Sequence, residues 1–352
     1  MTSSAFMITA AVTLGAGAAV AGRPDSPPPM PDLVFTGGCD ASAGLLLDEH
    51  HLLVADDEDK KKTELRVYDL RSPGAPKSTI DLTAGLASDP EEPEVDLEGL
   101  TRFGARLALI GSHSRRGDQA KPAPSRRRIL AFTLSGTAPA LALGTTTRYE
   151  KLVEQAQAFL ATLPASNPLK TLVLDRDLPS KKGGLSIEAL SDTAIPGELL
   201  IGFRSPLAPG EKALLLLVTN AAAVLDTGAA ATFGPPILLD LGKQGLRDLV
   251  RDPKGGYIIL AGNPGDGGTF ALWRWTGPSS PAAPTKIRTI DTPGPGTSAE
   301  GVVLTATPDT ALILFDEGER PLPHPTAELA TCKDQKRPDR SFRVRRVDIA
   351  AQ

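Results

Sequence analysis

The sequence predicts an all-β protein that folds as a β-propeller of five four-stranded blades. Three observations carry this prediction. Gly and Pro contribute 34 and 32 of the 352 residues without a collagen-like period, which indicates many tight turns. A unit built from an acidic segment and several apolar runs recurs five times along the chain. One apolar stretch near the N-terminus belongs to no unit, and the last unit lacks a strand.

Each unit begins with a short segment in which one acid lies among small or aliphatic residues. A polar turn follows, and then a short apolar run bounded by turn residues, which is typical of a strand. The two segments together predict a β-hairpin. The five acids are Asp40, Glu98, Glu188, Asp248 and Glu300, and the five apolar runs are residues 51–55, 107–111, 199–203, 257–261 and 311–315.

A third strand follows a polar loop in every unit, and a fourth can be placed in every unit but the last. The third strands are predicted over residues 65–70, 129–134, 213–218, 270–275 and 342–347, and the fourth over residues 78–82, 140–143, 236–241 and 285–291. The fifth unit runs out of chain, whereas residues 32–36 form an unassigned strand at the other end. A strand donated from the opposite terminus closes a propeller and leaves only short, protected sheet edges.

The spacing of the acids bears on the number of blades. The interval from Glu98 to Glu188 is longer than the other three. It contains residues 150–163, an amphipathic stretch that predicts one inserted helix. We therefore predict five blades, and six would follow if this interval holds a degenerate blade.

The N-terminal segment predicts export. Residues 1–21 carry no charge, are rich in small and apolar residues, and end in Ala19-Val20-Ala21, the small-x-small pattern of a cleavage site. We interpret residues 1–21 as a signal peptide, residues 22–31 as a Pro-rich spacer and residues 32–352 as one propeller domain. The alternative is an Ala-rich tail on a cytoplasmic protein, because the segment has no Lys or Arg near its start. No segment of the mature chain is long and apolar enough to predict a membrane span.

Charge and cysteine content exclude several classes of function. The net charge is −4 and the pI about 5.7, whereas nucleic acids and anionic membranes bind strongly basic proteins. Two cysteines are too few for a zinc ribbon or an iron–sulfur site. Cys39 follows the donated strand and Cys332 lies in the last long loop, so in an exported protein they could form a disulfide that fastens the ring. The alternative is two unrelated thiols.

The candidate site lies at one mouth of the predicted central channel. In a blade the first strand lines the channel, and its start lies on the same face as the loop between the second and third strands. The five acids should therefore ring this mouth, and oxygen ligands in a ring suit Ca²⁺. Arg115 and Arg204 lie in the loops and are expected to bind an anion. His113 is the candidate proton carrier.

A structural interpretation of the same residues is equally open. An acid that recurs in every blade can accept hydrogen bonds from backbone N–H groups of the neighbouring blade. Repetition favours this role, because a catalytic residue is needed only once. The short basic run of residues 126–128 is expected to be solvated.

Several ordered motifs resemble a bacterial β-propeller family of unknown function, related to phytase-like or esterase-like propellers. They include Asp96-x-Glu-Gly-Leu, Gly111-Ser-His-Ser-Arg115, Gly202-Phe-Arg-Ser-Pro206 and Leu272-Trp-Arg-Trp275. The resemblance covers residues 32–349 and implies a propeller without an established activity. Ala189 departs from the Glu-Gly pattern, and the loop of residues 319–340 leaves the alignment of the last blade open. Analogy with the phytase-like propellers suggests Ca²⁺-assisted hydrolysis of phosphoesters.

Two functional hypotheses follow. In the first, an exported propeller binds an anionic small molecule at the channel mouth, with Asp40, Glu98, Glu188, Asp248 and Glu300 on Ca²⁺. If this propeller is an enzyme, the expected reaction is hydrolysis of a phosphoester or other ester. In this hypothesis Arg115 and Arg204 clamp the anion, and His113 shuttles a proton. In the second, the propeller is a non-catalytic module that binds a protein or glycan of the cell envelope, and the acids fasten the blades.

Overall fold

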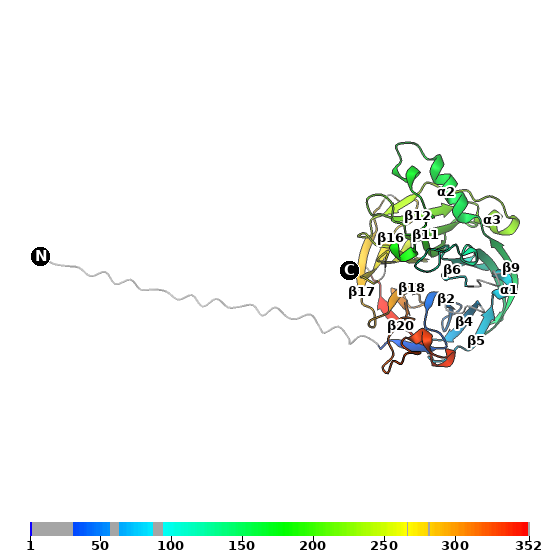
Figure 1. The fold of residues 1–352 in the computed structure, drawn as a ribbon, viewed down its shortest axis with the longest axis vertical. Coiled ribbons are helices and arrows are strands. Elements are labelled where there is room, and N and C mark those ends of the chain that lie inside the picture. The colour runs from blue at the N-terminus through cyan, green and yellow to red at the C-terminus, as the bar shows by residue number, and fades with distance from the viewer. Residues whose placement is uncertain (2–30, 57–62, 87–93, 266, 281, 351–352) are drawn as a thin grey trace. The chain divides into compact units, whose positions relative to one another are not determined.

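The chain forms a closed ring of five four-stranded antiparallel sheets, as the sequence predicts (Figure 1). The computed structural model describes residue 1 and residues 31–56, 63–86, 94–265, 267–280 and 282–350. Apart from Met1 and Pro31, the predicted signal peptide and spacer lie outside these residues. All helices and strands described below lie within Asp32–Gln352, which forms one compact unit.

Four blades take their strands from consecutive sequence. The first contains β2 (Ala41–Leu46), β3 (His51–Asp56), β4 (Glu64–Asp69) and β5 (Ser78–Asp81). The second contains β6 (Leu97–Phe103), β7 (Arg106–Gly111), β8 (Ile129–Thr137) and β9 (Ala140–Tyr149). The third contains β10 (Ser186–Asp192), β11 (Leu199–Ser205), β12 (Ala213–Val218) and β13 (Ile237–Leu239). The fourth contains β14 (Gly245–Arg251), β15 (Tyr257–Gly262), β16 (Phe270–Trp275) and β17 (Thr285–Ile290).

The fifth blade joins the two ends of the domain. It contains β18 (Ser298–Leu304), β19 (Thr310–Asp316) and β20 (Ser341–Asp348), and β1 (Leu33–Thr36) pairs with β20 as its outer strand. The predicted donation of residues 32–36 to the last blade is confirmed. Because the ring is closed by strand pairing, neither end of the sheet series is left open.

Aromatic side chains reinforce the closure between the first and last blades. Phe35 of β1 and Phe342 of β20 pack against Tyr68 of β4, with ring centroids 4.9 Å and 5.4 Å from that of Tyr68. The Tyr68 hydroxyl donates to the carbonyl of Thr36 at 3.1 Å. The contact therefore joins the donated strand to the blade that follows it in the chain.

The predicted possibility of a disulfide between Cys39 and Cys332 is also confirmed. The two half-cystines are bonded, with their Cα atoms 6.2 Å apart across 293 residues of sequence. Cys39 lies between β1 and β2, and Cys332 lies in the long segment between β19 and β20. The bond fastens the ring where its ends meet.

The core is divided among the contacts between blades. Each pair of neighbouring blades encloses a cluster of buried apolar side chains, because strands in the middle of a blade are covered by a sheet on either side. Such strands are buried on both faces, as in β11 and β15, where all residues are buried. This double coverage explains why the sequence shows continuous apolar runs and not strict alternation.

The α-helices lie at the outer side of the ring of sheets (Figure 1). The helix predicted over residues 150–163 is α2 (Leu152–Thr162), which buries Leu152, Val153, Ala156 and Leu160 against the core. The other short helices are α1 (Thr83–Leu86), α3 (Ala221–Thr227) and the 3₁₀ turns Pro124–Arg126, Pro168–Thr171, Ser180–Lys182, Cys332–Asp334 and Arg337–Asp339. Among the described residues, no helix has the length and apolar character needed to cross a membrane.

The innermost strand of each blade carries a β-bulge at an equivalent position. The register between the first and second strands skips one residue in every blade. The skipped residues, named the bulge residues below, are Ser42, Glu98, Glu188, Arg247 and Glu300. A bulge bends the strand and redirects a side chain, so it can aim one residue per blade at a common point.

Candidate functional site

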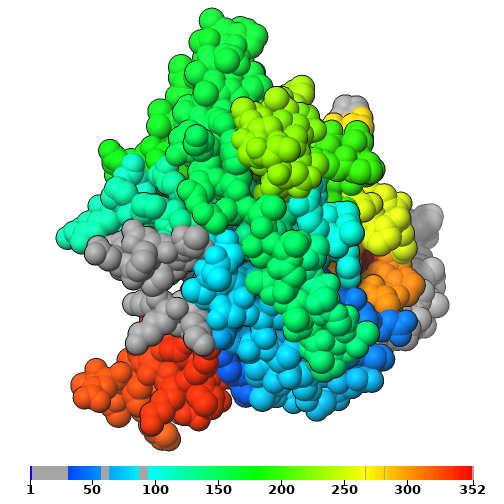
Figure 2. Space-filling view, turned by 90° about the vertical axis from the view of Figure 1, so that its right-hand side faces the viewer, coloured from blue at the N-terminus to red at the C-terminus, as the bar shows by residue number. Residues whose placement is uncertain are grey.

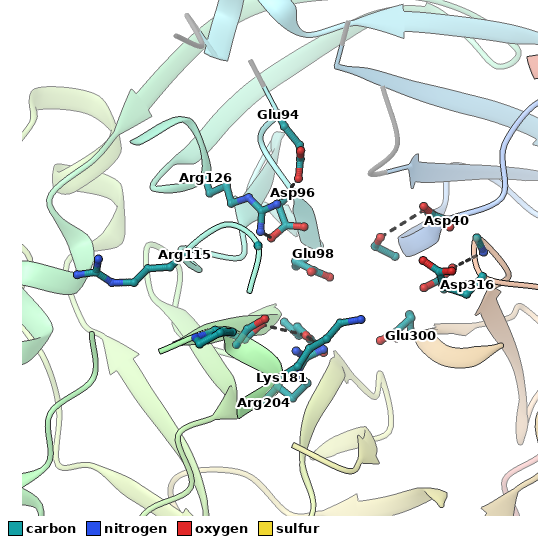
Figure 3. Close-up of a pocket in the computed structure, with 18 of the residues that line it drawn as sticks. Asp40, Glu94, Asp96, Glu98, Arg115, Arg126, Lys181, Arg204, Glu300 and Asp316 are labelled. Carbon is teal, nitrogen blue, oxygen red and sulfur yellow. Dashed lines mark hydrogen bonds and ion pairs between the residues drawn. The ribbon is translucent and has the colours of Figure 1, made fainter. Parts of the chain in front are cut away.

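The bulge residues meet in a cavity of about 500 Å³ at one mouth of the channel, which we name the first cavity (Figure 3). All five bulge residues line it. Loops after the second strands complete the wall with Arg115, Arg126, Gly318 and Glu319, and Lys333 and Lys181 add further charge. The predicted arrangement, with strand starts and these loops on one face, is therefore confirmed.

A small residue follows the bulge in four of the five blades, and packing explains why. A Cβ added at Gly99 would lie 2.7 Å from the Cβ of Leu190 in the next blade. Ala43, Ala189 and Gly301 occupy the equivalent position in three other blades. The Glu-Gly and Glu-Ala patterns therefore combine an acid that faces the cavity with a small residue that lets neighbouring blades approach closely.

Four buried side chains form an alternating charge network in the wall of the first cavity. An Arg204 guanidinium nitrogen lies 2.7 Å from one oxygen of Glu188, and an Arg247 nitrogen lies 3.2 Å from the other. The same Arg247 nitrogen donates to both oxygens of Glu300 at 2.6 Å. We name Arg204, Glu188, Arg247 and Glu300 the charge network.

The charge network brings together residues that the sequence assigned to different roles. Glu188 and Glu300 were predicted to bind metal and Arg204 to bind an anion. In the structure each acid is paired with an arginine instead. Glu188 is further held by the Ser186 hydroxyl, which donates at 3.1 Å, and the Arg247 guanidinium lies over the ring of Phe270 at 5.5 Å. The side chains of the charge network are thus fixed in place.

Burial and neighbouring charges change the pKa values of ionisable side chains in this wall. Burial raises the pKa of Glu300 from 4.5 to about 7, Arg247 opposes this rise, and Glu188 and Asp316 add to it as like charges. Burial alone would lower the pKa of Arg247, but Glu300 and Glu188 raise it, so the guanidinium stays charged. A carboxyl that titrates near neutral pH in a polar cavity is a candidate proton donor and acceptor.

A second group of acids faces the charge network across the first cavity (Figure 3). Asp40 and Glu98 lie here as predicted, and Asp316 at the end of β19 joins them. The backbone N–H of Gly318 donates to Asp316 at 2.7 Å, and a Cβ at Gly318 would collide with the Asp40 carboxylate. A larger residue at position 318 would therefore displace the Asp40 carboxylate from its place in the cavity.

The structure does not arrange these acids as a finished metal site. Among the described residues, no three Asp, Glu, His or Cys side chains are placed to hold one metal ion. The oxygen donors of Asp40, Glu98 and Asp316 suit a hard cation in kind. A Ca²⁺ ion would therefore have to draw these carboxylates together.

Arg126 lines the first cavity, so the prediction that it is solvated is wrong. It pairs with Glu94, and its other terminal nitrogen lies 2.6 Å from Asp96. The same nitrogen donates to the Ser114 hydroxyl at 2.6 Å. Its neighbour Arg128 is largely buried as well, so this basic run is structural. The acids of the Asp96-x-Glu motif could have indicated this location of Arg126, because neighbouring acids predict a basic side chain close by.

Arg115 lies at the edge of the first cavity, but it is directed elsewhere. Its guanidinium pairs with Asp175 at 3.0 Å and with Asp177 at 2.7 Å. Figure 3 shows the side chain extending away from Glu98 and Glu300. The geometry therefore favours Arg204 and Arg247 over Arg115 as the basic side of the site.

His113 does not line the first cavity. It is fully buried with a left-handed φ of 55°, and neither ring nitrogen has a hydrogen-bond partner among the described residues. Burial, reinforced by the charge of Arg127, lowers its pKa to about 3. The imidazole is thus neutral at physiological pH, and the geometry does not support its predicted part as proton carrier.

The structure also places Asp248 outside the first cavity, contrary to the prediction. Arg247 occupies the bulge of β14, so Asp248 falls one position later and turns away. One of its oxygens accepts from the backbone N–H of Leu249 at 2.7 Å, and the other accepts from that of Val302 in the next blade at 2.8 Å. Asp248 therefore has the blade-fastening role that was weighed as the alternative.

An alignment of the inner-strand motifs would have placed Arg247, and not Asp248, at the bulge position. The segments Ile187–Leu190 and Leu246–Leu249 both begin and end with an aliphatic residue. Aligned on these residues, Arg247 occupies the position of Glu188. The sequence prediction instead aligned Asp248 with Glu188, because both are acids. The aliphatic residues were the better guide, because they pack between blades while the bulge residue is free to vary.

Comparison with known proteins identifies the family. A family described as a protein of unknown function, DUF3616, matches residues 40–132 and 138–315, which together exceed half of the chain. The chain belongs to DUF3616. The resemblance to a propeller family of unknown function is thereby confirmed, and its suggested relation to phytase-like or esterase-like propellers stays a prediction. No curated protein matches the chain in sequence.

Solved structures with similar folds include enzymes and other propellers at very low identity. A luciferin-regenerating enzyme is 11% identical, with a TM-score of 0.38 over 90% of this chain and 95% of that one. A putative oxidoreductase (glucose dehydrogenase) from a Thermus species is 12% identical, with a TM-score of 0.35 over 90% and 100%. A putative 6-phosphogluconolactonase from Bacteroides uniformis is 13% identical, with a TM-score of 0.34 over 79% and 64%. Likeness at this level carries no argument about the function of this DUF3616 protein.

Proposed function

We propose that the first cavity binds a small ligand with an anionic group and that Glu300 exchanges a proton with it. The charge network carries this proposal. Burying an ion network contributes little to stability compared with apolar residues of the same volume, because desolvation offsets the attraction. Binding of an anionic ligand to Arg204 and Arg247 in the wall of the first cavity would account for the charge network, which its contribution to stability does not explain.

The charge balance of the first cavity favours a cation that enters with the anion. Nine acidic and six basic side chains occur among its described lining residues. An anion alone would meet net repulsion from this surface. We propose Ca²⁺ on the side of Asp40, Glu98 and Asp316, with the anionic group on the side of Arg204, Arg247 and Lys181.

Hydrolysis of a phosphoester or other ester is the reaction class that fits these groups. In the protonated state Glu300 can donate its proton to a leaving oxygen, and in the ionised state it can accept a proton from water. Arg204 and Arg247 would stabilise negative charge that develops on the substrate. In this proposal the residues of the charge network both position the substrate and hold the proton.

Export of the protein is part of the proposal. The Cys39–Cys332 bond supports an oxidising compartment, because disulfides persist outside the cytosol. Ca²⁺ is also available at millimolar levels in such compartments only, so the two proposals agree with one another.

Turnover of p-nitrophenyl phosphate, bis(p-nitrophenyl) phosphate and p-nitrophenyl acetate, each with chelator and with Ca²⁺, tests the proposal. We expect Glu300→Gln to lower kcat by about a hundredfold, because the isosteric amide cannot carry the proton. The matched control is Arg274→Gln, which breaks a 2.8 Å pair with Asp252 outside the first cavity and should leave turnover unchanged.

Two outcomes of these measurements would contradict the proposal. Turnover unaffected by Glu300→Gln would contradict the role of Glu300. Absence of turnover, together with a melting temperature that none of the three compounds or Ca²⁺ changes, would favour the non-catalytic hypothesis. Capture of an envelope protein or glycan would then be the next experiment. Figure 2 shows the orange-to-red segment after β19 projecting from the body of the propeller, where a macromolecule could reach it.

A further inference from the structure

A second cavity, of about 290 Å³, lies at the opposite mouth of the channel. The first cavity is lined by the starts of the inner strands, whereas the second is lined by their ends, and each strand runs along the channel. Its wall is mostly aliphatic, with Leu46, Leu100, Leu249, Val250, Val302 and Leu304 drawn from four blades. The two mouths therefore differ in chemistry, one highly charged and one apolar.

The charged side chains at the rim of the second cavity have partners of their own. Arg251 pairs with Asp192 at 2.7 Å, and Arg102 donates to the carbonyl of Leu46 at 2.7 Å. These contacts tie neighbouring blades together across the rim. The rim is thus held in place while the apolar wall stays accessible.

Asp248 supplies a carboxylate to this apolar wall. The equivalent positions in the other blades hold Ala43, Gly99, Ala189 and Gly301, so the acid is specific to the fourth blade. The amides of Leu249 and Val302 orient its two oxygens, but amides carry no net charge. Glu300 acts on the carboxyl as a like charge. A carboxylate can accept about four hydrogen bonds, so a cationic donor can still bind.

We propose that the second cavity binds a small apolar molecule with a primary ammonium group. The hydrocarbon part would contact the aliphatic wall, and the ammonium group would contact Asp248. A pocket that is largely apolar with one well-placed polar group is the usual form of a small-molecule site. Burial of the hydrocarbon supplies affinity, and the charged hydrogen bond supplies specificity.

Calorimetric titration of the full chain at pH 8 with hexylammonium, hexanol and hexanoate tests the proposal. We expect hexylammonium to bind roughly tenfold more tightly than hexanol, because a hydrogen bond to a charged group contributes that much, and hexanoate to bind most weakly. Equal binding of all three, tightest binding of hexanoate, or no saturable binding of hexylammonium would overturn it.

Variants locate the bound molecule. Leu304→Lys, at the part-buried rim, should weaken hexylammonium binding by about tenfold or more, whereas Ile287→Lys, part-buried on the outer strand β17, should leave it unchanged. Asp248→Asn should abolish the preference of hexylammonium over hexanol, with circular dichroism to check that the variant folds. Glu98→Gln, in the first cavity, should leave binding unchanged. Binding that survives Leu304→Lys but falls in Glu98→Gln would overturn the proposal and place the ammonium group in the first cavity.

Discussion

Arg247 and Asp248 are adjacent in sequence, yet they face different ends of the channel. The bulge directs Arg247 to the first cavity, and the next residue turns to the second. Each is buried, and each has partners that hold it: two acids for Arg247 and two backbone amides for Asp248. A single residue of register therefore decides which chemistry each mouth has.

The raised pKa of Glu300 predicts a pH dependence of stability. The folded chain keeps a proton on this carboxyl that the unfolded chain releases above about pH 4.5. The stability contributed by this group is therefore present below pH 4.5 and is lost as the pH rises through about 7. We expect Glu300→Gln to flatten the curve of unfolding free energy in this window, by about 3 kcal/mol for the shift from 4.5 to about 7.

Urea unfolding at several pH values between 4 and 8 measures this effect. Glu319→Gln, which removes an exposed charge at the edge of the same cavity, is the control and should keep the wild-type slope. Part of the slope should also remain in Glu300→Gln, because burial raises the pKa of Asp248 to about 7 as well. An unchanged slope in Glu300→Gln would contradict the raised pKa of Glu300.

The inner strand is the element that couples the site to the fold. Each inner strand contributes a bulge residue to the first cavity, and four of the five place a small residue next to it at the contact with the next blade. The two requirements lie on adjacent residues, as in Glu98 and Gly99. The acid can vary without disturbing the packing, whereas the small residue cannot.

Gly99→Ala tests whether the residue after the bulge has to be small for neighbouring blades to pack. The added Cβ would lie 2.7 Å from the Leu190 Cβ and 3.0 Å from the Leu190 backbone nitrogen, so the blades would have to separate. We expect a loss of about 1–3 kcal/mol in unfolding free energy, as measured by urea denaturation. Gly294→Ala, where a Cβ would meet nothing within 4 Å, should change little. A loss of the same size in both variants would contradict the packing argument.

At the scale of the whole molecule, ring closure and the first cavity share a structural support. Cys39 precedes Asp40 and Cys332 precedes Lys333, and both of these neighbours line the first cavity. The disulfide therefore holds the last loop over the mouth as well as fastening the ends of the ring. Loss of the bond should affect stability and the site together.

Cys39→Ser/Cys332→Ser is expected to lower the unfolding free energy by about 2–4 kcal/mol, because the bond closes a very long loop in the unfolded chain. Denaturation of the wild type with and without a reductant gives an independent measure of the same quantity. The double variant should be insensitive to the reductant. A wild-type stability that the reductant does not change would contradict the prediction.

Thermal melting with chelator and with millimolar Ca²⁺ tests the proposed cation. We expect an increase of several degrees with Ca²⁺, since a ligand that binds only the folded state stabilises it. The increase should disappear in Glu98→Gln and persist in Asp248→Asn, which lies outside the first cavity. No increase in the wild type would make Asp40, Glu98 and Asp316 structural residues.

The sequence by itself determined the ring. Turn-bounded apolar runs, the recurring acid and the unpaired strand at residues 32–36 predicted the strands, the inserted helix and the closure, and they favoured five blades over six. These features depend on local patterns and on chain order. It also placed Asp40, Glu98, Glu188, Arg204 and Glu300 at one mouth. The cysteines could be paired only as one of two alternatives, since a bond across 293 residues depends on geometry.

Only the tertiary structure decided the electrostatics and the register. It showed that Glu188 and Glu300 pair with Arg204 and Arg247, that Arg126 lines the first cavity and that His113 is buried. These facts depend on contacts between blades, which no local pattern encodes. The position of Asp248 also depended on the tertiary structure. The bulge skips one residue, Arg247, and this turns every later side chain of the strand to another direction.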